Sequence, residues 1–213
     1  HDDSISFNNA VFYIRKYFIG KEFDTYKWLS APSLIIPQGV MKIKSTIELD
    51  PSCCSTIFKG TIINAKELGE DSTVAIKVAG SNKGTYGGWG QSSFEICGFG
   101  LIGSGKDNNK TGYIGSRNSD TYNQNNRYFL HNFAITGFTD GYLIGDNDYC
   151  RPVENFEIWE CKNGLGAFNG ENSGERLTFK DGTIFNCDKA INAGGTLWFI
   201  NCSIDYNTQA LQL

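Results

Sequence analysis

Long apolar runs, an excess of positive charge and closely spaced metal ligands are all missing from this chain of 213 residues. Without an apolar run of about 18 residues, the sequence predicts no transmembrane helix and no insertion into a membrane. The formal net charge of −4 argues against nucleic acid as a partner, because nucleic acids are bound through basic patches. The first residues, His-Asp-Asp-Ser, are polar and do not form a signal peptide.

Cysteine and histidine spacing gives no sign of a metal centre. The chain has no Cys-x-x-Cys pair and no Cys/His cluster at the spacings typical of zinc sites, so we expect neither a metal nor another cofactor. Seven cysteines leave at least one thiol without a partner in the chain. His131 is the only histidine beyond His1. It precedes the inward Phe133 by two residues and is interpreted as a core side chain rather than a general base.

A short pattern headed by isoleucine recurs four times in the second half of the chain. The four starts lie 23, 26 and 20 residues apart, at Ile135, Ile158, Ile184 and Ile204. The sixth following residue is always small (Gly141, Gly164, Ala190, Ala210), and the seventh is always apolar (Tyr142, Leu165, Ile191, Leu211). Repeats of this length indicate a solenoid, in which each unit buries its apolar face by stacking on the next.

Alternation within each unit predicts β-strands. Phe156 and Ile158 point to one side and Glu157 and Trp159 to the other. The same step makes Phe133/Ile135, Gly182/Ile184 and Cys202/Ile204 inward pairs. A bend is expected between the third and sixth positions after each isoleucine, near residues that tolerate left-handed backbone, namely Gly137, Gly141, Asn163 and Gly164. A second strand then carries the seventh and ninth positions. This is one coil of a parallel β-helix, and the alternative is an antiparallel β-sandwich.

The repeat also places two cysteines. Cys161 and Cys187 both lie three residues after an isoleucine, so they should stack in neighbouring coils. We expect free buried thiols there, which behave as small apolar side chains, rather than a disulfide. Free thiols fit assembly in a reducing cytosol.

The first half of the chain carries a family resemblance. Residues 34–43, Leu-Ile-Ile-Pro-Gln-Gly-Val-Met-Lys-Ile, resemble the apolar–Pro–x–Gly–x–apolar first coil of pectate-lyase-like β-helices. Before it, Asp3 or Ser4 can cap a helix that continues to about Ile19. Its apolar face is predicted to contain Ile5, Phe7, Ala10, Val11, Ile14 and Phe18. This order of an acidic start, a capping helix and a Pro-x-Gly strand is similar to that of bacteriophage tailspikes and capsule depolymerases.

The resemblance implies an all-β fold, a right-handed single-stranded parallel β-helix with a short N-terminal capping α-helix. Residues 1–33 would form the helix and a linker with Trp28 over the solenoid end, and residues 34–213 the coils. The resemblance further implies a homotrimer in the full-length protein, located in the virion after assembly in the cytoplasm of the bacterial host. Because Leu213 falls at the ninth position of a coil, we expect further coils beyond it.

Between these regions the spacing of apolar residues is less regular. Early strands are expected around Ile43, Ile47, Ile57 and Ile62–Ile63, and Val74, Ile76 and Val78 form another by alternation. Phe94, Ile96 and Leu101 should return to the core. Two polar excursions are predicted, one at residues 80–93 and the other at residues 103–126, with regular coils from Phe129 onward.

Outward positions carry the candidate chemistry. Glu157 and Asp181 lie one coil apart and one outward step apart, which predicts a diagonal of roughly 8 Å. This separation suits an inverting glycosidase, in which one carboxyl protonates the leaving oxygen and the other activates water. Four further residues are predicted to bind substrate, with Trp159 and Phe185 offering flat surfaces to sugar rings and Asp205 and Asn155 lying beside them. Nearby carboxylates could replace either acid: Asp146, Asp148, Glu160, Glu171 and Glu175.

Three functional hypotheses follow from this resemblance and these residues. The first is degradation of a bacterial surface polysaccharide, capsule or O-antigen, by hydrolysis. The second is a polysaccharide lyase of the same fold. A lyase would need a base that removes a proton beside a uronate carboxylate, with Arg127, Arg151 or Lys162 assisting. The third is a glycan-binding or structural β-helix without catalysis.

Overall fold

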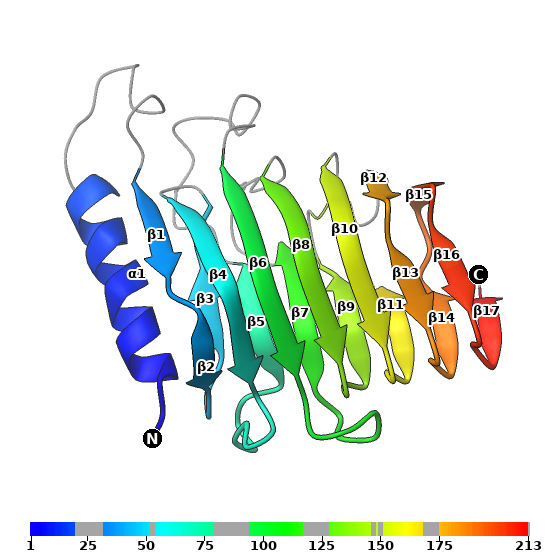
Figure 1. Cartoon of the computed structure of the whole chain (residues 1–213), viewed down its shortest axis with the longest axis horizontal. Helices are drawn as coiled ribbons and strands as arrows, with labels where there is room; N and C mark the ends of the chain where they lie inside the picture. The colour runs from blue at the N-terminus through cyan, green and yellow to red at the C-terminus, as the bar shows by residue number, and fades with distance from the viewer. Residues whose placement is uncertain are drawn as a thin grey trace.

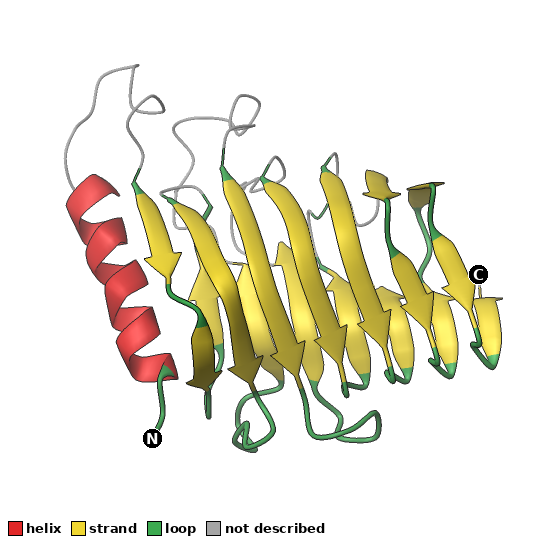
Figure 2. Ribbon diagram, viewed as in Figure 1, coloured by secondary structure: helices red, strands yellow, loops and turns green. Residues whose placement is uncertain are grey.

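The computed structural model describes residues 1–19, 32–51, 54–78, 94–116, 128–145, 148, 151–167 and 175–212. Two predicted features, Trp28 and the excursion at residues 80–93, lie outside these ranges. The described part of the chain contains one helix and seventeen strands. Figure 2 shows the strands arranged in two layers with the helix at one end.

The strands form two sheets, and every pairing in them is parallel. Sheet A contains β1 (Ser33–Ile36), β2 (Gly39–Lys42), β4 (Ser55–Asn64), β6 (Glu95–Ile102), β8 (Phe129–Thr136), β10 (Pro152–Trp159), β12 (Glu175–Lys180), β13 (Thr183–Phe185), β15 (Thr196–Ile200) and β16 (Ser203–Asp205). Sheet B contains β3 (Ile47–Leu49), β5 (Val74–Val78), β7 (Thr111–Ser116), β9 (Asp140–Ile144), β11 (Asn163–Ala167), β14 (Lys189–Asn192) and β17 (Gln209–Gln212).

Along the chain, one or two consecutive strands of sheet A are followed by one strand of sheet B, and successive units follow one another along the long axis of the molecule (Figure 1). This arrangement is consistent with a parallel β-solenoid. An antiparallel sandwich does not fit it, because no described strand pair is antiparallel. Among the described residues, no helix is long and apolar enough to cross a membrane.

The register of the repeat is confirmed. Ile158 lies opposite Ile135 on one side and Ile184 on the other, and Ile184 lies opposite Ile204. In sheet B the seventh positions pair in the same way, from Tyr142 through Leu165 and Ile191 to Leu211. The sheet A column continues toward the N-terminus through Leu101, Ile63 and Met41. It therefore spans seven units, three more than the sequence pattern revealed.

A column of aromatic rings, some stacked and some edge-to-face, runs through the interior beside the isoleucine column. Neighbouring ring centroids lie 5.3–5.8 Å apart from Phe58 through Phe99, Phe133, Phe156 and Phe179 to Phe199. Each aromatic pair contributes about 0.5–1.5 kcal/mol beyond the burial of its surface. The ring of Phe156 also fills the space that a Cβ on Gly182 would occupy, so the inward position of Gly182 is confirmed.

Small residues at the sixth position are explained by close packing rather than by backbone conformation. A Cβ on Gly141 would lie 2.7 Å from Cγ2 of Ile158, and one on Gly164 would lie 2.5 Å from Cγ2 of Ile184. Neither glycine has a positive φ, so the left-handed backbone predicted at Gly141 and Gly164 is wrong, whereas that predicted at Gly137 is confirmed. The left-handed residue instead comes two positions after each isoleucine, at Gly137, Glu160, Asn186 and Tyr206, with φ of 76°, 50°, 54° and 54°.

Helix α1 (Ser4–Ile19) closes the N-terminal end of the solenoid (Figure 1). The Asp3 carbonyl accepts the first helical hydrogen bond from the amide of Phe7, at 3.0 Å, so Asp3 is the N-cap. The Asp3 carboxylate accepts a hydrogen bond from the amide of Lys42 at 2.8 Å and thereby ties the helix to β2. Phe7 and Val11 are buried against the first units. Ile5 is 62% exposed, so its predicted place on the buried face is wrong.

Polar side chains of the helix form hydrogen bonds and an ion pair with residues at the strand edge beneath it. The Asn8 amide donates to the carbonyl of Thr46 at 2.8 Å and accepts from the amide of Glu48 at 3.0 Å. Arg15 forms a 2.8 Å ion pair with the buried Asp50. The two Asn8 contacts occupy backbone groups at the edge of β3, the first strand of sheet B, which would otherwise be open to pairing with another chain.

Most of the remaining strand predictions are confirmed, with one exception. Strand β5 covers Val74–Val78, and Phe94, Ile96 and Leu101 are buried. The excursion predicted at residues 103–126 is wrong in its middle, because β7 lies there with Tyr113 and Ile114 buried. The free thiols of Cys161 and Cys187 are both buried, as predicted.

Candidate functional site

A row of left-handed residues divides the outer face of sheet A into two surfaces. Asn132, Asn155, Asp181 and Asn201 have φ of 54°, 50°, 52° and 52°. We call this row the ladder, because side-chain hydrogen bonds link Asn155 to Asn132 at 2.5 Å and Asn201 to Asp181 at 2.6 Å. Asparagine and aspartate tolerate this backbone conformation better than other residues with side chains. The ladder thus combines a backbone requirement with links between neighbouring units.

The ladder interrupts the alternation of inward and outward side chains. In β8, Leu130 is buried, the next two residues face outward, and Phe133 is buried again. His131 therefore lies on the outer face, half-buried, and the prediction that it belongs to the core is wrong. We call the outer surface before the ladder the upstream face and the outer surface after it the downstream face.

The downstream face holds most of the predicted site. Glu157 lies between Ala134 and Thr183, and Thr183 pairs with Ser203. In the next row, Trp159 pairs with Thr136 on one side and Phe185 on the other, and Phe185 pairs with Asp205. Both rows have the register that the repeat predicts, because Glu157 comes one residue before Ile158 and Trp159 one residue after it. Glu157 and Asp205 are exposed, whereas Trp159 and Phe185 are half-buried. Asp205 also accepts a hydrogen bond from the Ser203 hydroxyl.

Trp159 and Phe185 stack on each other. Their centroids are 5.8 Å apart and their planes differ by 6°, so each ring covers one face of the other. The partners of the two rings on the outer sides of the pair are Thr136 and Asp205, whose side chains are smaller than the rings.

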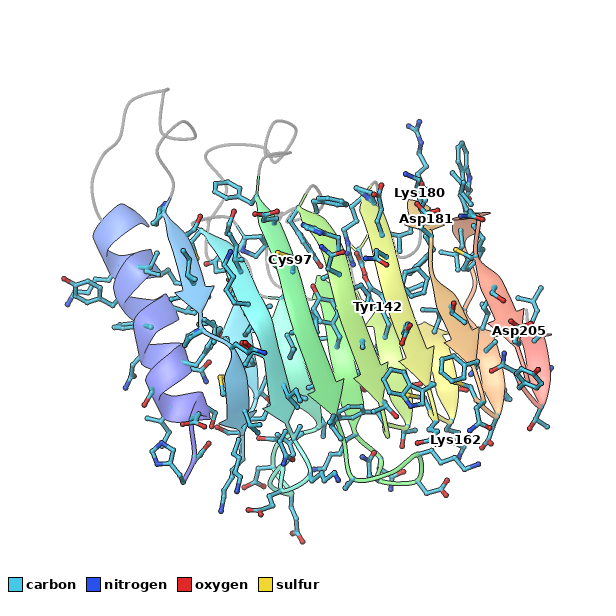
Figure 3. The ribbon with its side chains drawn as sticks, in the orientation of Figure 1. Cys97, Tyr142, Lys162, Lys180, Asp181 and Asp205 are labelled. Carbon is cyan, nitrogen blue, oxygen red and sulfur yellow. The ribbon has the colours of Figure 1, made fainter. Side chains whose placement is uncertain are left out.

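Asp181 belongs to the ladder and not to a strand. Its carboxylate accepts a hydrogen bond from the Asn201 amide, and the Lys180 ammonium lies 3.5 Å away. The Asn201 hydrogen bond, with the charge of Lys180, holds the pKa of Asp181 below its ordinary value. Figure 3 labels Lys180 and Asp181 at the end of β12 and Asp205 further along the sheet. Asp181 is thus an ionised carboxylate at neutral pH, but the lowered pKa makes it a weaker base than an ordinary aspartate.

No known family model matches the chain. No curated protein gives a significant match to it either. The assignment of the candidate site therefore relies on the geometry of the structure alone.

The upstream face contains a second group of reactive side chains, which sequence spacing did not reveal. Cys97 and His131 lie opposite each other in β6 and β8, and Glu95 precedes Cys97 by two residues on the same face. Nε2 of His131 lies 3.0 Å from a carboxylate oxygen of Glu95. One ligand atom from each of the three residues lies within 4.8 Å of the other two. Figure 3 labels Cys97 on β6.

Two other predicted residues form a buried ion pair. Asp148 and Arg151 are at most 2% exposed, and Nε and Nη2 of Arg151 donate to the carboxylate at 2.6 and 2.9 Å. The Tyr142 hydroxyl adds a third hydrogen bond to Asp148 at 2.9 Å, and the guanidinium lies 4.4 Å from the centre of the Tyr128 ring. Burial raises the pKa of Asp148, while the bidentate guanidinium acts in the opposite direction.

This pair has a structural role. Neither Asp148 nor Arg151 can reach a substrate on the surface, so the roles considered for them in hydrolysis and lyase chemistry are wrong. Among the other predicted residues, Glu160 and Lys162 are exposed beyond the end of β10. The structure describes only the backbone of Glu175, and three residues lie outside the described ranges: Arg127, Asp146 and Glu171.

Proposed function

We propose that the protein is a tailspike-type, right-handed parallel β-helix that binds and hydrolyses a bacterial surface polysaccharide on its downstream face. The protein would be a homotrimer in its full-length form and part of a phage virion. Several observations support this proposal: a solenoid-like arrangement of parallel strands, a helix over its N-terminal end, the Pro-x-Gly strand at β1–β2, and free thiols at Cys97, Cys161, Cys187 and Cys202. Free thiols suit assembly in a reducing cytosol.

The single observation that carries the proposal is the stacked Trp159–Phe185 pair beside Glu157 and Asp205. Apolar C–H faces of sugar rings pack well against aromatic rings, while sugar hydroxyls need polar partners. The downstream face offers both, because a carboxylate lies in the row beside Trp159 and another lies beyond Phe185. The ladder amides, including that of Asn155, add further hydrogen-bonding groups along the same edge.

In the proposed reaction, Glu157 is the general acid and Asp181 is the general base. Glu157 donates a proton to the glycosidic oxygen as the bond to the anomeric carbon breaks. Asp181 removes a proton from a water molecule, whose oxygen attacks that carbon from the opposite side. The expected carboxyl separation of roughly 8 Å falls in the range of about 6.5–9.5 Å that leaves room for this water and gives inversion. The lowered pKa of Asp181 leaves its carboxylate unprotonated, as a general base must be, but also makes it a weaker base.

The experiment is incubation of the protein with purified capsule and O-antigen polysaccharides, followed by analysis of product size and new reducing ends. Glu157→Gln should abolish cleavage and leave binding nearly unchanged, because the amide cannot donate an acidic proton. Trp159→Ala should weaken binding about tenfold through loss of one ring face. Glu70→Gln is the matched control, because Glu70 is exposed between β4 and β5, away from the downstream face.

The outcomes separate the proposed activity from its two competitors. Binding that depends on Trp159 without any cleavage would replace hydrolysis by glycan recognition alone. An unsaturated product that absorbs in the ultraviolet would mean elimination by a lyase. Normal turnover in Glu157→Gln would remove Glu157 from the reaction, and unchanged binding in Trp159→Ala would remove the downstream face from recognition.

A further inference from the structure

The upstream face places three metal-binding side chains together on rigid strands. Glu95 and Cys97 point to the same side of β6 because they are two residues apart. His131 is the direct partner of Cys97 in the adjacent strand β8, and adjacent strands lie about 4.8 Å apart. A thiolate, an imidazole and a carboxylate are the ligand types that bind Zn²⁺. Sites built on strands hold their ligands in more constant positions than sites on loops.

Only small movements separate the observed positions from a tetrahedral zinc site. Usual bond lengths of about 2.0–2.3 Å place tetrahedral ligand atoms about 3.4–3.6 Å apart. Nε2 of His131 and the Glu95 oxygen are now 3.0 Å apart, and no pair among the three ligand atoms exceeds 4.8 Å. Side-chain rotations that shorten the longest separation by at most about 1.2 Å and widen the 3.0 Å separation by about 0.4 Å would therefore complete the geometry.

The surroundings fix the histidine ring. Phe129 stacks on the imidazole of His131 with centroids 4.2 Å apart and planes 19° apart. Nδ1 of His131 lies 2.9 Å from the amide of the ladder residue Asn132. Metal-binding histidines usually have a hydrogen-bond partner at the second ring nitrogen, which sets the orientation and tautomer of the ring. Asn132 can fill this role.

The same contacts argue against a catalytic cysteine at this position. A nucleophilic cysteine needs a lowered pKa and a base directed at its sulfur. Burial and the negative charge of Glu95 instead raise the pKa of Cys97, and Nε2 of His131 is directed at Glu95. A metal ion would offset both effects, because its positive charge stabilises the thiolate and neutralises the carboxylate.

We propose that Glu95, Cys97 and His131 bind one Zn²⁺ ion on the upstream face, with water in the fourth coordination position. The ion binds the Cys97 sulfur, which releases its proton to solvent, and Nε2 of His131, whose proton moves to Nδ1. Asn132 then turns its amide so that the oxygen accepts from Nδ1, and Asn155 turns in the same sense to preserve the ladder. This site lies across the ladder from the proposed glycan surface and does not depend on glycan binding.

The test is calorimetric titration of the chelator-treated full chain with Zn²⁺ alone. We expect one ion per chain, and at least a 100-fold weaker affinity in either Cys97→Ser or His131→Gln. Asn132→Gly removes the amide and tolerates the left-handed backbone, so it should weaken binding by about 10- to 100-fold. Cys202→Ser is the matched control, because Cys202 is another free cysteine, located between β15 and β16 at the far end of sheet A. The Cys202→Ser variant should bind zinc with the same affinity as the unaltered chain.

A cobalt titration gives a readout that a structural role would not move. Co²⁺ in the site should produce a thiolate-to-metal charge-transfer band that disappears in Cys97→Ser and persists in Cys202→Ser. Circular dichroism of the metal-free variants establishes that each one is folded. The proposal is overturned if the unaltered chain binds no zinc, or if folded Cys97→Ser and His131→Gln variants bind it with unchanged affinity.

Discussion

Stacking of the units can be tested at Gly164. An alanine at this position would place its Cβ 2.5 Å from Cγ2 of Ile184 and 2.7 Å from the carbonyl oxygen of Ala190. An ordinary contact begins near 3.4 Å, so the two overlaps are about 0.9 and 0.7 Å by difference. Both neighbouring atoms belong to the next unit and one of them is backbone. The overlap can therefore be relieved only by moving β13 and β14 away from their partner strands.

Such overpacking costs about 1–3 kcal/mol, and the backbone overlap favours the upper half of this range. Replacing glycine also removes freedom from the unfolded chain, which returns about 0.4–1 kcal/mol. The free energy of unfolding should thus fall by about 1–2.5 kcal/mol, or roughly 2–10 °C in Tm for a chain of this size. Urea and thermal unfolding followed by circular dichroism measure both quantities.

Gly100→Ala is the matched control for Gly164→Ala. Gly100 is also a strand glycine without a positive φ, but no atom lies within 4 Å of the Cβ it would gain. Its replacement should change the free energy of unfolding by less than about 0.5 kcal/mol. Equal stability of the two variants would refute the explanation that the sixth position is small because neighbouring units stack closely.

Two further predictions concern charged groups. Asp148→Asn leaves the buried guanidinium of Arg151 without its ionic partner and should lower the free energy of unfolding, measured in urea, by about 3–5 kcal/mol. The double variant Asp148→Leu/Arg151→Met should lose less stability, because no buried charge is left unpaired. A larger loss of stability in the double variant would contradict this account. Because the folded-state pKa of Asp181 is lowered, its stabilising contribution is present above the unfolded-state pKa of about 3.9 and is lost as pH falls through the folded-state value. Asn201→Ala should raise the pKa of Asp181 in an NMR titration, and an unchanged pKa would show that the ladder hydrogen bond does not cause the shift.

The sequence pattern located the late units because their strands are joined by short connections. Seven residues separate Ile135 from its sheet B counterpart Tyr142, but 13 separate Ile63 from Ile76 and 12 separate Leu101 from Tyr113. Insertions of this kind occur at turns, where they leave the stacked strands undisturbed. A fixed spacing was therefore a reliable signal in the second half of the chain and hid the two units of Ile63 and Leu101. In the first unit, the spacing from Met41 to Ile47 is six residues, one short of the later value, and methionine replaces the leading isoleucine.

Left-handed residues explain why one side chain was assigned to the wrong side. Counting in steps of two from Phe133 assumes extended backbone throughout, and this assumption places His131 in the core. Asn132 breaks it, because a left-handed residue reverses the inward–outward order on its two sides. Asparagine at the same offset in three of the four units was a signal for this bend. The shared offset places these residues in one row across the sheet, but counting in steps of two misses the effect of their backbone on the strand before them.

The two candidate sites differ in how far a sequence can reveal them. The downstream face was predictable because Glu157, Trp159 and Phe185 keep fixed offsets from buried isoleucines whose register the repeat determines. The cluster of Glu95, Cys97 and His131 depends on pairing between β6 and β8, which belong to units of unequal length. Side chains on the outer surface of a solenoid meet across strands rather than along the chain, so the spacing of ligands in the sequence has no fixed relation to their distance in space. The strand register can be established from the buried columns. It then shows which outward side chains are neighbours, and sites on the surface of a solenoid must be derived from it.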